Sequence, residues 1–219
     1  MTHYHPKRDS SGRLVPLHHP HTPAALETWL DAKRLATVVP GSAMPPAIFD
    51  IPISSWTDAP SRGADWERLA LDPRFDEPPY QKPDGMKAAS GAVVVEADGR
   101  IWVVSPSNKF AGYCNTFPKG TVSAKEPLSL RANALKEVHE EAGLRISLIR
   151  FLCDSLRNQS YTRYYLAHRI GGNPADMGWE SQAAHLVPPA GISQFVTHPN
   201  DRPILAALNH LGSALHSGS

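Results

Sequence analysis

Three glutamates crowd one short stretch of the chain, "KEVHEEAGL", residues 136–144. At ~100° per residue of an α-helix, Glu140 lies about 300° and Glu141 about 40° around the axis from Glu137, so the three carboxylates share one sector. Like charges three and four residues apart repel each other on a bare helix. Carboxylate oxygens are also the ligands that Mg²⁺ takes together with water and substrate phosphates. The spacing therefore predicts a divalent-metal site that acts on a phosphorylated substrate.

The residues around these glutamates predict the helix that would carry them. An apolar stripe occupies the core-facing side of this helix and consists of Leu128, Ala134, Leu135, Val138 and Ala142. Gly143 is suited to follow the last helical turn in a left-handed conformation. We therefore expect a helix from about residue 128 to residue 142.

A longer pattern includes the residues that precede this helix. Gly120 is followed after five residues by Glu126, and after nine more by the run from Lys136 to Leu144. This order resembles the Nudix box, G-x5-E-x7-R-E-U-x-E-E-x-G-U, in which U is an apolar residue. The box would span residues 120–144, and the resemblance extends over about 89–210 when the surrounding strand pattern is counted.

The resemblance implies a Nudix hydrolase, a metal-dependent enzyme that cleaves phosphoanhydride bonds. It makes Glu140 and Glu141 the principal metal ligands and the Gly120 carbonyl a further ligand. Glu137 becomes another ligand or the base that takes a proton from the attacking water. Glu180, in a later loop, is a candidate for an additional carboxylate at the site, and a solvated loop glutamate is the alternative. The implied cofactor is Mg²⁺, with Mn²⁺ as the alternative, and the metal would neutralise phosphate oxygens and activate water.

Two features depart from the box. Nine residues rather than seven separate Glu126 from Lys136, which inserts two residues between the loop and the helix. Lys136 also replaces the box arginine, which in the family pairs with the glutamate at the position of Glu126 and braces the loop. Lysine keeps the charge but lacks the guanidinium fork that binds a carboxylate through two hydrogen bonds. If Lys136 pairs with Glu126 despite the insertion, the brace is preserved. Neither change alters the three-glutamate face, so the resemblance still implies activity.

Side chains outside the box bear on what is attached to the diphosphate. Lys119 could place a positive charge against a phosphate, with an exposed loop lysine as the alternative. Tyr161 lies 17 residues after Leu144, where dinucleoside polyphosphate hydrolases of the family tend to carry a tyrosine. Tyr161 and Trp179 could stack on a base, although tyrosines in strands are also typical of core packing. Arg163 could supply one of the cationic contacts that a long polyphosphate needs. These residues favour a dinucleoside polyphosphate, such as diadenosine tetraphosphate, as the substrate.

Three other functions remain open. ADP-ribose or nucleotide-sugar pyrophosphatases share the box, but they tend to carry a proline near the position of Tyr161, and here none occurs before Pro174. An enzyme that clears oxidised nucleoside triphosphates shares every box residue and would differ in its products. A non-catalytic Nudix domain that binds a nucleotide is a further alternative, and the retained carboxylates count against it.

The composition of the 219 residues bounds the partners of the chain. With 22 Lys and Arg and 21 Asp and Glu, the formal charge is +1, which supplies no general argument for a nucleic-acid or membrane partner. No apolar run approaches the ~18 residues of a membrane span, and the N-terminus lacks the apolar segment of a secretory signal. Cys114 and Cys153 match neither a metal-ligand spacing nor a disulfide framework. We expect a cytoplasmic protein with a small-molecule nucleotide substrate, and a homodimer is left open.

The distribution of prolines and apolar runs suggests how the chain is divided. Of 21 prolines, 13 precede residue 89, and five of the 11 histidines lie in the first 21 residues. We expect a disordered tail over 1–21 and an arm over 22–88 that packs on the main domain, with a helix over 22–35 and loop-like chain from Pro40 to Pro83. The Nudix hydrolase domain would span 89–212, and 213–219 would be a C-terminal tail.

The pattern after residue 88 predicts an α/β fold. Two β-branched runs joined through Asp98-Gly99 indicate a hairpin. Further strands are expected over 145–155, 160–172 and 179–188, a short helix over 189–196, and a final helix near 204–211 that Asn200 could cap. Strands on both sides of a central helix suggest a mixed β-sheet between helices, an α/β/α sandwich.

Overall fold

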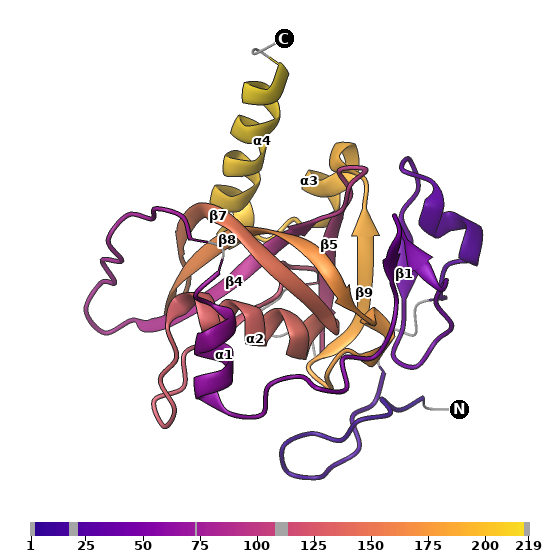
Figure 1. Ribbon diagram of the computed structural model, residues 1–219, viewed down its shortest axis with the longest axis horizontal. Coiled ribbons are helices and arrows are strands. Elements are labelled where there is room, and N and C mark those ends of the chain that lie inside the picture. The colour runs from indigo at the N-terminus through magenta and orange to yellow at the C-terminus, as the bar shows by residue number, and fades with distance from the viewer. Residues whose placement is uncertain (1–2, 18–21, 73, 108–113, 217–219) are drawn as a thin grey trace.

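Figure 1 shows the computed structural model, which describes residues 3–17, 22–72, 74–107 and 114–216, with side chains described as far as residue 211. The α-helices are α1 (Gly63–Leu69), α2 (Leu130–Ala142), α3 (Ile192–Phe195) and α4 (Arg202–His216). The 3₁₀ helices are η1 (Leu26–Leu30), η3 (Pro174–Asp176), η4 (Pro189–Gly191) and η5 (Pro199–Asp201). The strands are β1 (Ala36–Val38), β2 (Ala47–Ile48), β3 (Ile51–Pro52), β4 (Lys87–Val95), β5 (Ile101–Pro106), β6 (Lys119–Thr121), β7 (Leu144–Leu156), β8 (Ser160–Gly172) and β9 (Ser181–Val187).

Within the described residues, seven strands form one mixed sheet in the order β1-β9-β5-β4-β8-β7, with β6 paired to β4. β4 and β8 are parallel, and the other pairs are antiparallel. Side chains of β4 alternate between the faces: Ala92 and Val94 join the core beneath α2, whereas Val93 joins the core beneath α3 and α4. Helices therefore cover both faces of the sheet (Figure 1), which confirms the predicted α/β/α fold.

The helix and strands predicted from local sequence patterns lie close to the expected residues. Ser129 caps α2 by accepting a hydrogen bond from the Ala132 amide, and Gly143 ends it at φ 67°. The helix begins two residues later than expected because Ser129 occupies the cap. The predicted hairpin is present, with Gly99 at φ 84° in its turn, and the strands expected after the helix are β7, β8 and β9.

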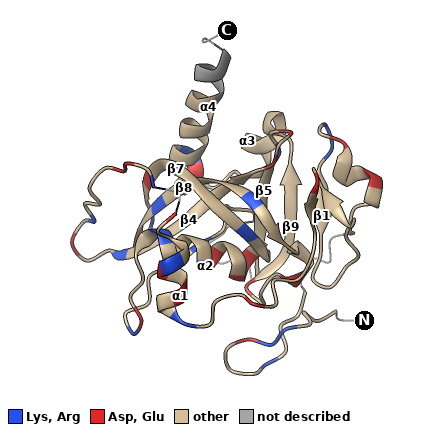
Figure 2. Ribbon diagram, in the orientation of Figure 1, with Lys and Arg blue, Asp and Glu red and all other residues tan. Residues whose placement is uncertain are grey.

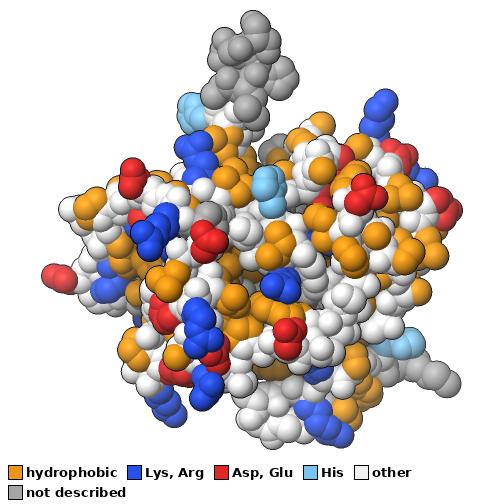
Figure 3. Space-filling model, in the orientation of Figure 1, with side chains coloured by type: hydrophobic (Ala, Val, Ile, Leu, Met, Phe, Trp, Pro, Cys, Tyr) orange, Lys and Arg blue, Asp and Glu red, His pale blue; other side chains and the backbone are white. Residues whose placement is uncertain are grey.

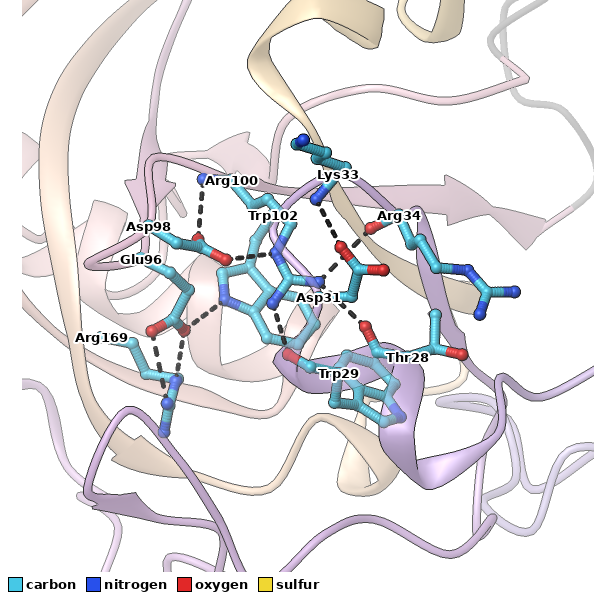
Figure 4. Close-up of polar contacts among 10 residues, drawn as sticks. All are labelled: Thr28, Trp29, Asp31, Lys33, Arg34, Glu96, Asp98, Arg100, Trp102 and Arg169. Carbon is cyan, nitrogen blue, oxygen red and sulfur yellow. Dashed lines mark hydrogen bonds and ion pairs between the residues drawn. The ribbon is translucent and has the colours of Figure 1, made fainter.

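The helix predicted over residues 22–35 is wrong. Only the 3₁₀ helix η1 forms, and the chain then pairs as β1 with β9. Arg100, fully buried and paired with Asp98, donates to the carbonyls of Thr28 (3.2 Å), Trp29 and Arg34 (Figure 4). The Asp31 amide also donates to the Thr28 carbonyl at the end of η1. The guanidinium group thus binds carbonyls that a longer helix would pair with its own amides, so tertiary contacts override the local helical pattern.

The N-terminal arm is built into the main core. Trp29, Ile48 and Trp66 are buried in the same cluster as the sheet residues Val94 and Trp102. The rings of Trp29 and Trp102 stack with centroids 5.8 Å apart. The segment from Pro40 to Pro83, which we expected to be loop-like, contains α1. This helix has seven residues and is too short to show a clear periodic pattern.

Residues 3–17 also fold against the rest of the molecule. An antiparallel bridge joins Tyr4 to Pro16, and His5 is buried. Gln182 Nε2 donates to the Pro16 carbonyl at 2.9 Å, and Lys7 donates to a carbonyl in η3. These contacts order a segment whose composition favoured a disordered tail. Residues 18–21 and 217–219 of the expected tails lie outside the described residues, and α4 extends to His216.

The surface agrees with the balanced composition. On the face in Figure 3, basic and acidic side chains are interspersed among apolar ones. In the part of the chain that the structure describes, no helix is both long enough and apolar enough to cross a bilayer.

Candidate active site

The Glu137 carboxylate of α2 lies directly against Gly120 of β6. A Cβ atom placed on Gly120 would come within 2.0 Å of Glu137 Oε2, so only glycine leaves room for this carboxylate. Asn133, one turn earlier on α2, donates from Nδ2 to the Gly120 carbonyl (3.1 Å) and to Ser90 Oγ of β4 (3.0 Å). The helix therefore fixes both the backbone of β6 and the carboxylate beside it.

Glu141 forms the second contact between α2 and β6. Its Oε2 accepts a hydrogen bond from the Lys119 backbone amide at 2.7 Å. Burial raises the pKa of Glu141 to about 7, against the opposing effect of Lys119. Burial also raises the pKa of Glu137 to about 8, and the charge of Glu141 adds to this effect. Both carboxyl groups thus lack enough nearby positive charge to remain fully ionised at neutral pH.

Glu140 lies on the more exposed part of the same face, where Lys136 binds it. Lys136 Nζ is 2.5 Å from Glu140 Oε2 and 4.0 Å from Glu137 Oε1. Lys136 and Glu140 are therefore neighbours one turn apart on α2. In Figure 2 acidic positions (red) are marked on the ribbon of α2. The brace between Lys136 and Glu126 is not formed, because Glu126 Oε1 instead accepts a hydrogen bond from the backbone amide of Gly63 at 2.8 Å.

A cavity of about 390 Å³ opens beside β6. Lys119, Gly120 and Glu141 line it, and so does Glu180, which lies in the connection between β8 and β9. Burial raises the pKa of Glu180, and the charge of Glu140 contributes to this shift. Four of the predicted site residues are thus brought together from three separate segments of the chain.

The donors in this region suit a hard divalent cation, although they are not gathered around one point. Among the described residues, no three His, Cys, Asp or Glu side chains converge as a metal-binding group. Glu140 is turned toward Lys136, and Glu141 toward the Lys119 amide. Carboxylates and a backbone carbonyl are nevertheless the oxygen donors that Mg²⁺ prefers. The raised pKa values show that the carboxylates have too little positive charge nearby to stabilise their ionised forms.

The other predicted substrate residues do not line this cavity. The Tyr161 ring packs on Tyr80 of the arm, with centroids 5.5 Å apart. Arg163 is 2% exposed and pairs with Asp154 and Glu77. Trp179, which is half-buried, accepts a hydrogen bond at its backbone carbonyl from Ser107 Oγ. These residues have structural contacts of their own at these positions.

Residues that the sequence pattern did not single out complete the cavity wall: Lys87, Arg157, Asn158, Gln159, Ser160, Thr162 and Asn200. Parallel pairing of β4 with β8 places Lys87 opposite Ser160 and so brings the β7–β8 turn to β6. Arg157 also binds Asp201 and the Tyr164 hydroxyl. No local spacing reports a parallel pairing between distant strands, so the sequence offered no direct signal for this wall.

Comparisons with known proteins place the whole glutamate pattern inside one matched region. The chain matches the family model for the NUDIX domain over residues 85–208, which is more than half its length. A search of curated proteins found no match.

Several solved structures are similar in fold. An Ap4A hydrolase from C. elegans is 18% identical with a TM-score of 0.48, over 59% of this chain and 98% of that one. A NUDIX hydrolase from Nitrosomonas europaea is 14% identical with a TM-score of 0.47, over 58% and 90%. An ADP-ribose pyrophosphatase from Streptococcus suis is 21% identical with a TM-score of 0.39, over 48% and 75%.

Proposed function

Because the chain belongs to the Nudix family of pyrophosphohydrolases, we propose that it hydrolyses a phosphoanhydride bond in a nucleoside diphosphate linked to another moiety. One observation carries the proposal: Gly120 and Glu141 of the box line the same cavity as Lys119 and Glu180. This arrangement supplies oxygen ligands, a cation for phosphate and a carboxylate that can accept a proton.

Each residue has a proposed role. Glu137, Glu140, Glu141 and the Gly120 carbonyl would hold Mg²⁺ or Mn²⁺, which would neutralise phosphate oxygens and lower the pKa of water. Lys119 binds a phosphate oxygen beside them. Glu180 lines the cavity from a different loop, and its carboxylate would accept a proton from the attacking water.

The substrate that we propose is a dinucleoside polyphosphate of the diadenosine tetraphosphate type. The described residues that line the cavity include Lys87, Lys119 and Arg157 but no aromatic side chain. A chain of several phosphates suits such a wall better than a stacked base does, and Asp201 already neutralises part of the Arg157 charge. The same polar cavity also suits the ribose phosphate half of ADP-ribose, which is therefore the second candidate.

Product identification tests both levels of the proposal. The protein would be incubated with Mg²⁺ or Mn²⁺ and either diadenosine tetraphosphate or ADP-ribose, and the products separated by chromatography. Asymmetric cleavage of the tetraphosphate gives ATP and AMP, whereas ADP-ribose gives AMP and ribose 5-phosphate. A kcat/KM tenfold or more in favour of ADP-ribose, about 1.4 kcal/mol in transition-state stabilisation, would reject the polyphosphate. Nucleotide binding without hydrolysis of either compound would reject the enzyme and favour a binding domain.

A further inference from the structure

The loop between β6 and α2 is held by the arm rather than from within the box. Glu126 accepts a hydrogen bond from the amide of Gly63, the first residue of α1. The first amides of a helix have no partner within the helix, so a carboxylate there satisfies one of them. A Cβ atom on Gly63 would lie 2.5 Å from Glu126 Oε1 and 3.1 Å from Leu128 Cδ2. The loop therefore approaches α1 as closely as a glycine permits.

A second, reciprocal contact joins α1 to the start of α2. Glu67 of α1 accepts hydrogen bonds from the Ser129 amide (2.5 Å) and the Ser129 hydroxyl (2.7 Å). Ser129 is the N-cap of α2. Each helix start is thus bound by a carboxylate from the other segment, and the inserted stretch between Glu126 and α2 is fixed at both ends.

Aromatic side chains extend this contact along α2. His139 lies between the proposed metal ligands in sequence, and its ring packs edge-on against Trp56 with centroids 5.0 Å apart. Trp66 of α1 packs against both, at 6.1 Å from His139 and 5.7 Å from Trp56. Since His139 and Glu137 belong to one rigid helix, the arm sets the rotation that presents Glu137 to Gly120.

We propose that Trp56, Gly63, Trp66 and Glu67, which we call the arm clamp, position α2 and the loop before it for catalysis. The clamp takes the place of a brace between Lys136 and Glu126 and leaves Lys136 to bind Glu140. This inference rests on the proposed function for its catalytic consequence, but the clamp itself is a feature of the substrate-free protein. Its members are positioning residues, because none of them lines the cavity.

Four variants separate the arm clamp from the brace. Glu67→Ala removes both contacts to Ser129, whereas Glu67→Gln keeps the shape and can still accept the amide hydrogen bond. Asp65→Ala is the matched control, because Asp65 is on the same helix and its ion pairs within the described residues are with Arg62 and Arg68. Lys136→Ala removes the cation that a brace within the box would need.

Hydrogen exchange on the substrate-free protein gives the first readout. We expect Glu67→Ala to speed exchange at residues 122–130, Glu67→Gln to restore most of the protection, and Asp65→Ala and Lys136→Ala to leave that segment unchanged. Faster exchange in Lys136→Ala together with unchanged exchange in Glu67→Ala would overturn the proposal. Since no substrate is used, this result is independent of whether the protein is a hydrolase.

Kinetics on the metal-loaded protein give the second readout. In Glu67→Ala we expect kcat to fall roughly tenfold while KM changes less than about twofold, because an interaction that orients catalytic groups acts mainly in the transition state. Glu67→Gln should recover most of kcat. If Glu67→Ala fails to fold, Gly63→Ala carries the test, because its Cβ atom should displace Glu126 and loosen the loop. Unchanged kcat in a variant whose loop exchange has accelerated would remove the catalytic role of the clamp.

Discussion

Two buried glutamates in this molecule have opposite surroundings. Glu96, at the end of β4, is 3% exposed and binds Arg169 through both its oxygens and the Trp102 indole through one (Figure 4). Glu137 is 9% exposed, yet the cation with which it forms an ion pair, Lys136, is 4.0 Å away, and burial raises its pKa to about 8. Buried charges that serve only structure are normally paired. The contrast supports the proposal that the Glu137 region binds a cation from outside the chain.

Substitutions of Glu137 and Glu141 should lower activity, whereas substitution of Glu96 should lower stability. The largest effect is expected for the glutamates of the box. Glu137→Gln and Glu141→Gln replace charged ligands by neutral ones of the same shape. We predict that each lowers kcat by ~10²–10⁴-fold. The melting temperature should stay the same or rise, because burial disfavours the ionised form of each carboxyl group, as its raised pKa shows. Near-normal turnover in either folded variant would remove the residue from the site.

The converse result is expected for the paired glutamate. Glu96→Gln leaves the Arg169 guanidinium buried without its counter-charge, and removing one partner of a buried ion pair costs about 3–5 kcal/mol. Arg169 also donates to the Ile48 carbonyl of the arm at 2.8 Å, so part of this loss should appear as loosening of the arm. Chemical denaturation measures the effect. A Glu96→Gln protein of normal stability with reduced kcat would contradict the assignment of Glu96 to stability rather than to activity.

The pH dependence of stability sharpens the comparison further. Between the ordinary carboxyl pKa of 4.5 and the raised values of about 7 for Glu141 and 8 for Glu137, the folded protein binds more protons than the unfolded chain. The free energy of unfolding of the metal-free protein should therefore fall as pH rises from about 5 to 8, on the order of 1 kcal/mol or more. Glu137→Gln should flatten this slope. Thermal melts across the pH range would contradict the assignment if both proteins gave the same curve.

The smallest effects concern residues around the cavity. Lys87→Ala removes an exposed cation from the cavity wall and should raise KM for a polyphosphate substrate up to about fivefold, since an ion pair made by an exposed side chain contributes about 0.2–1 kcal/mol. Tyr161→Phe should change KM little, because the Tyr161 ring packs on Tyr80 and does not line the cavity. Steady-state kinetics compare the two. A larger effect of Tyr161→Phe than of Lys87→Ala would restore the tyrosine to the substrate site.

Sequence patterns were informative where the physics is local. The helix α2, its glycine end and the β4–β5 turn depend on residues within a few positions of one another, and each was predicted. The Ser129 cap is equally local, but it was not singled out, and the predicted start of the helix was two residues early. The α/β arrangement followed from the order of these elements. The three-glutamate face is also local, since it follows from helical periodicity alone.

The remaining features depend on contacts between distant segments. The helix expected over 22–35 was overridden by Arg100, which lies more than 60 residues further along the chain. The partner of Glu126 is an amide on α1, a helix hidden in a proline-rich stretch. Lys87 and Arg157 reach the cavity through the parallel pairing of β4 with β8. None of these contacts has a spacing rule that a single sequence displays.

The central claim is that the uncompensated carboxylates of α2 bind a divalent metal. Calorimetric titration of Mn²⁺ into the metal-free protein at pH 7, in two buffers of different ionisation enthalpy, measures metal binding and proton release together. With the pKa of Glu137 raised to about 8 and that of Glu141 to about 7, binding should displace roughly one proton per metal ion. Glu137→Gln should bind more weakly and release fewer protons. Absence of Mn²⁺ binding, or identical binding and proton release in Glu137→Gln, would contradict the account.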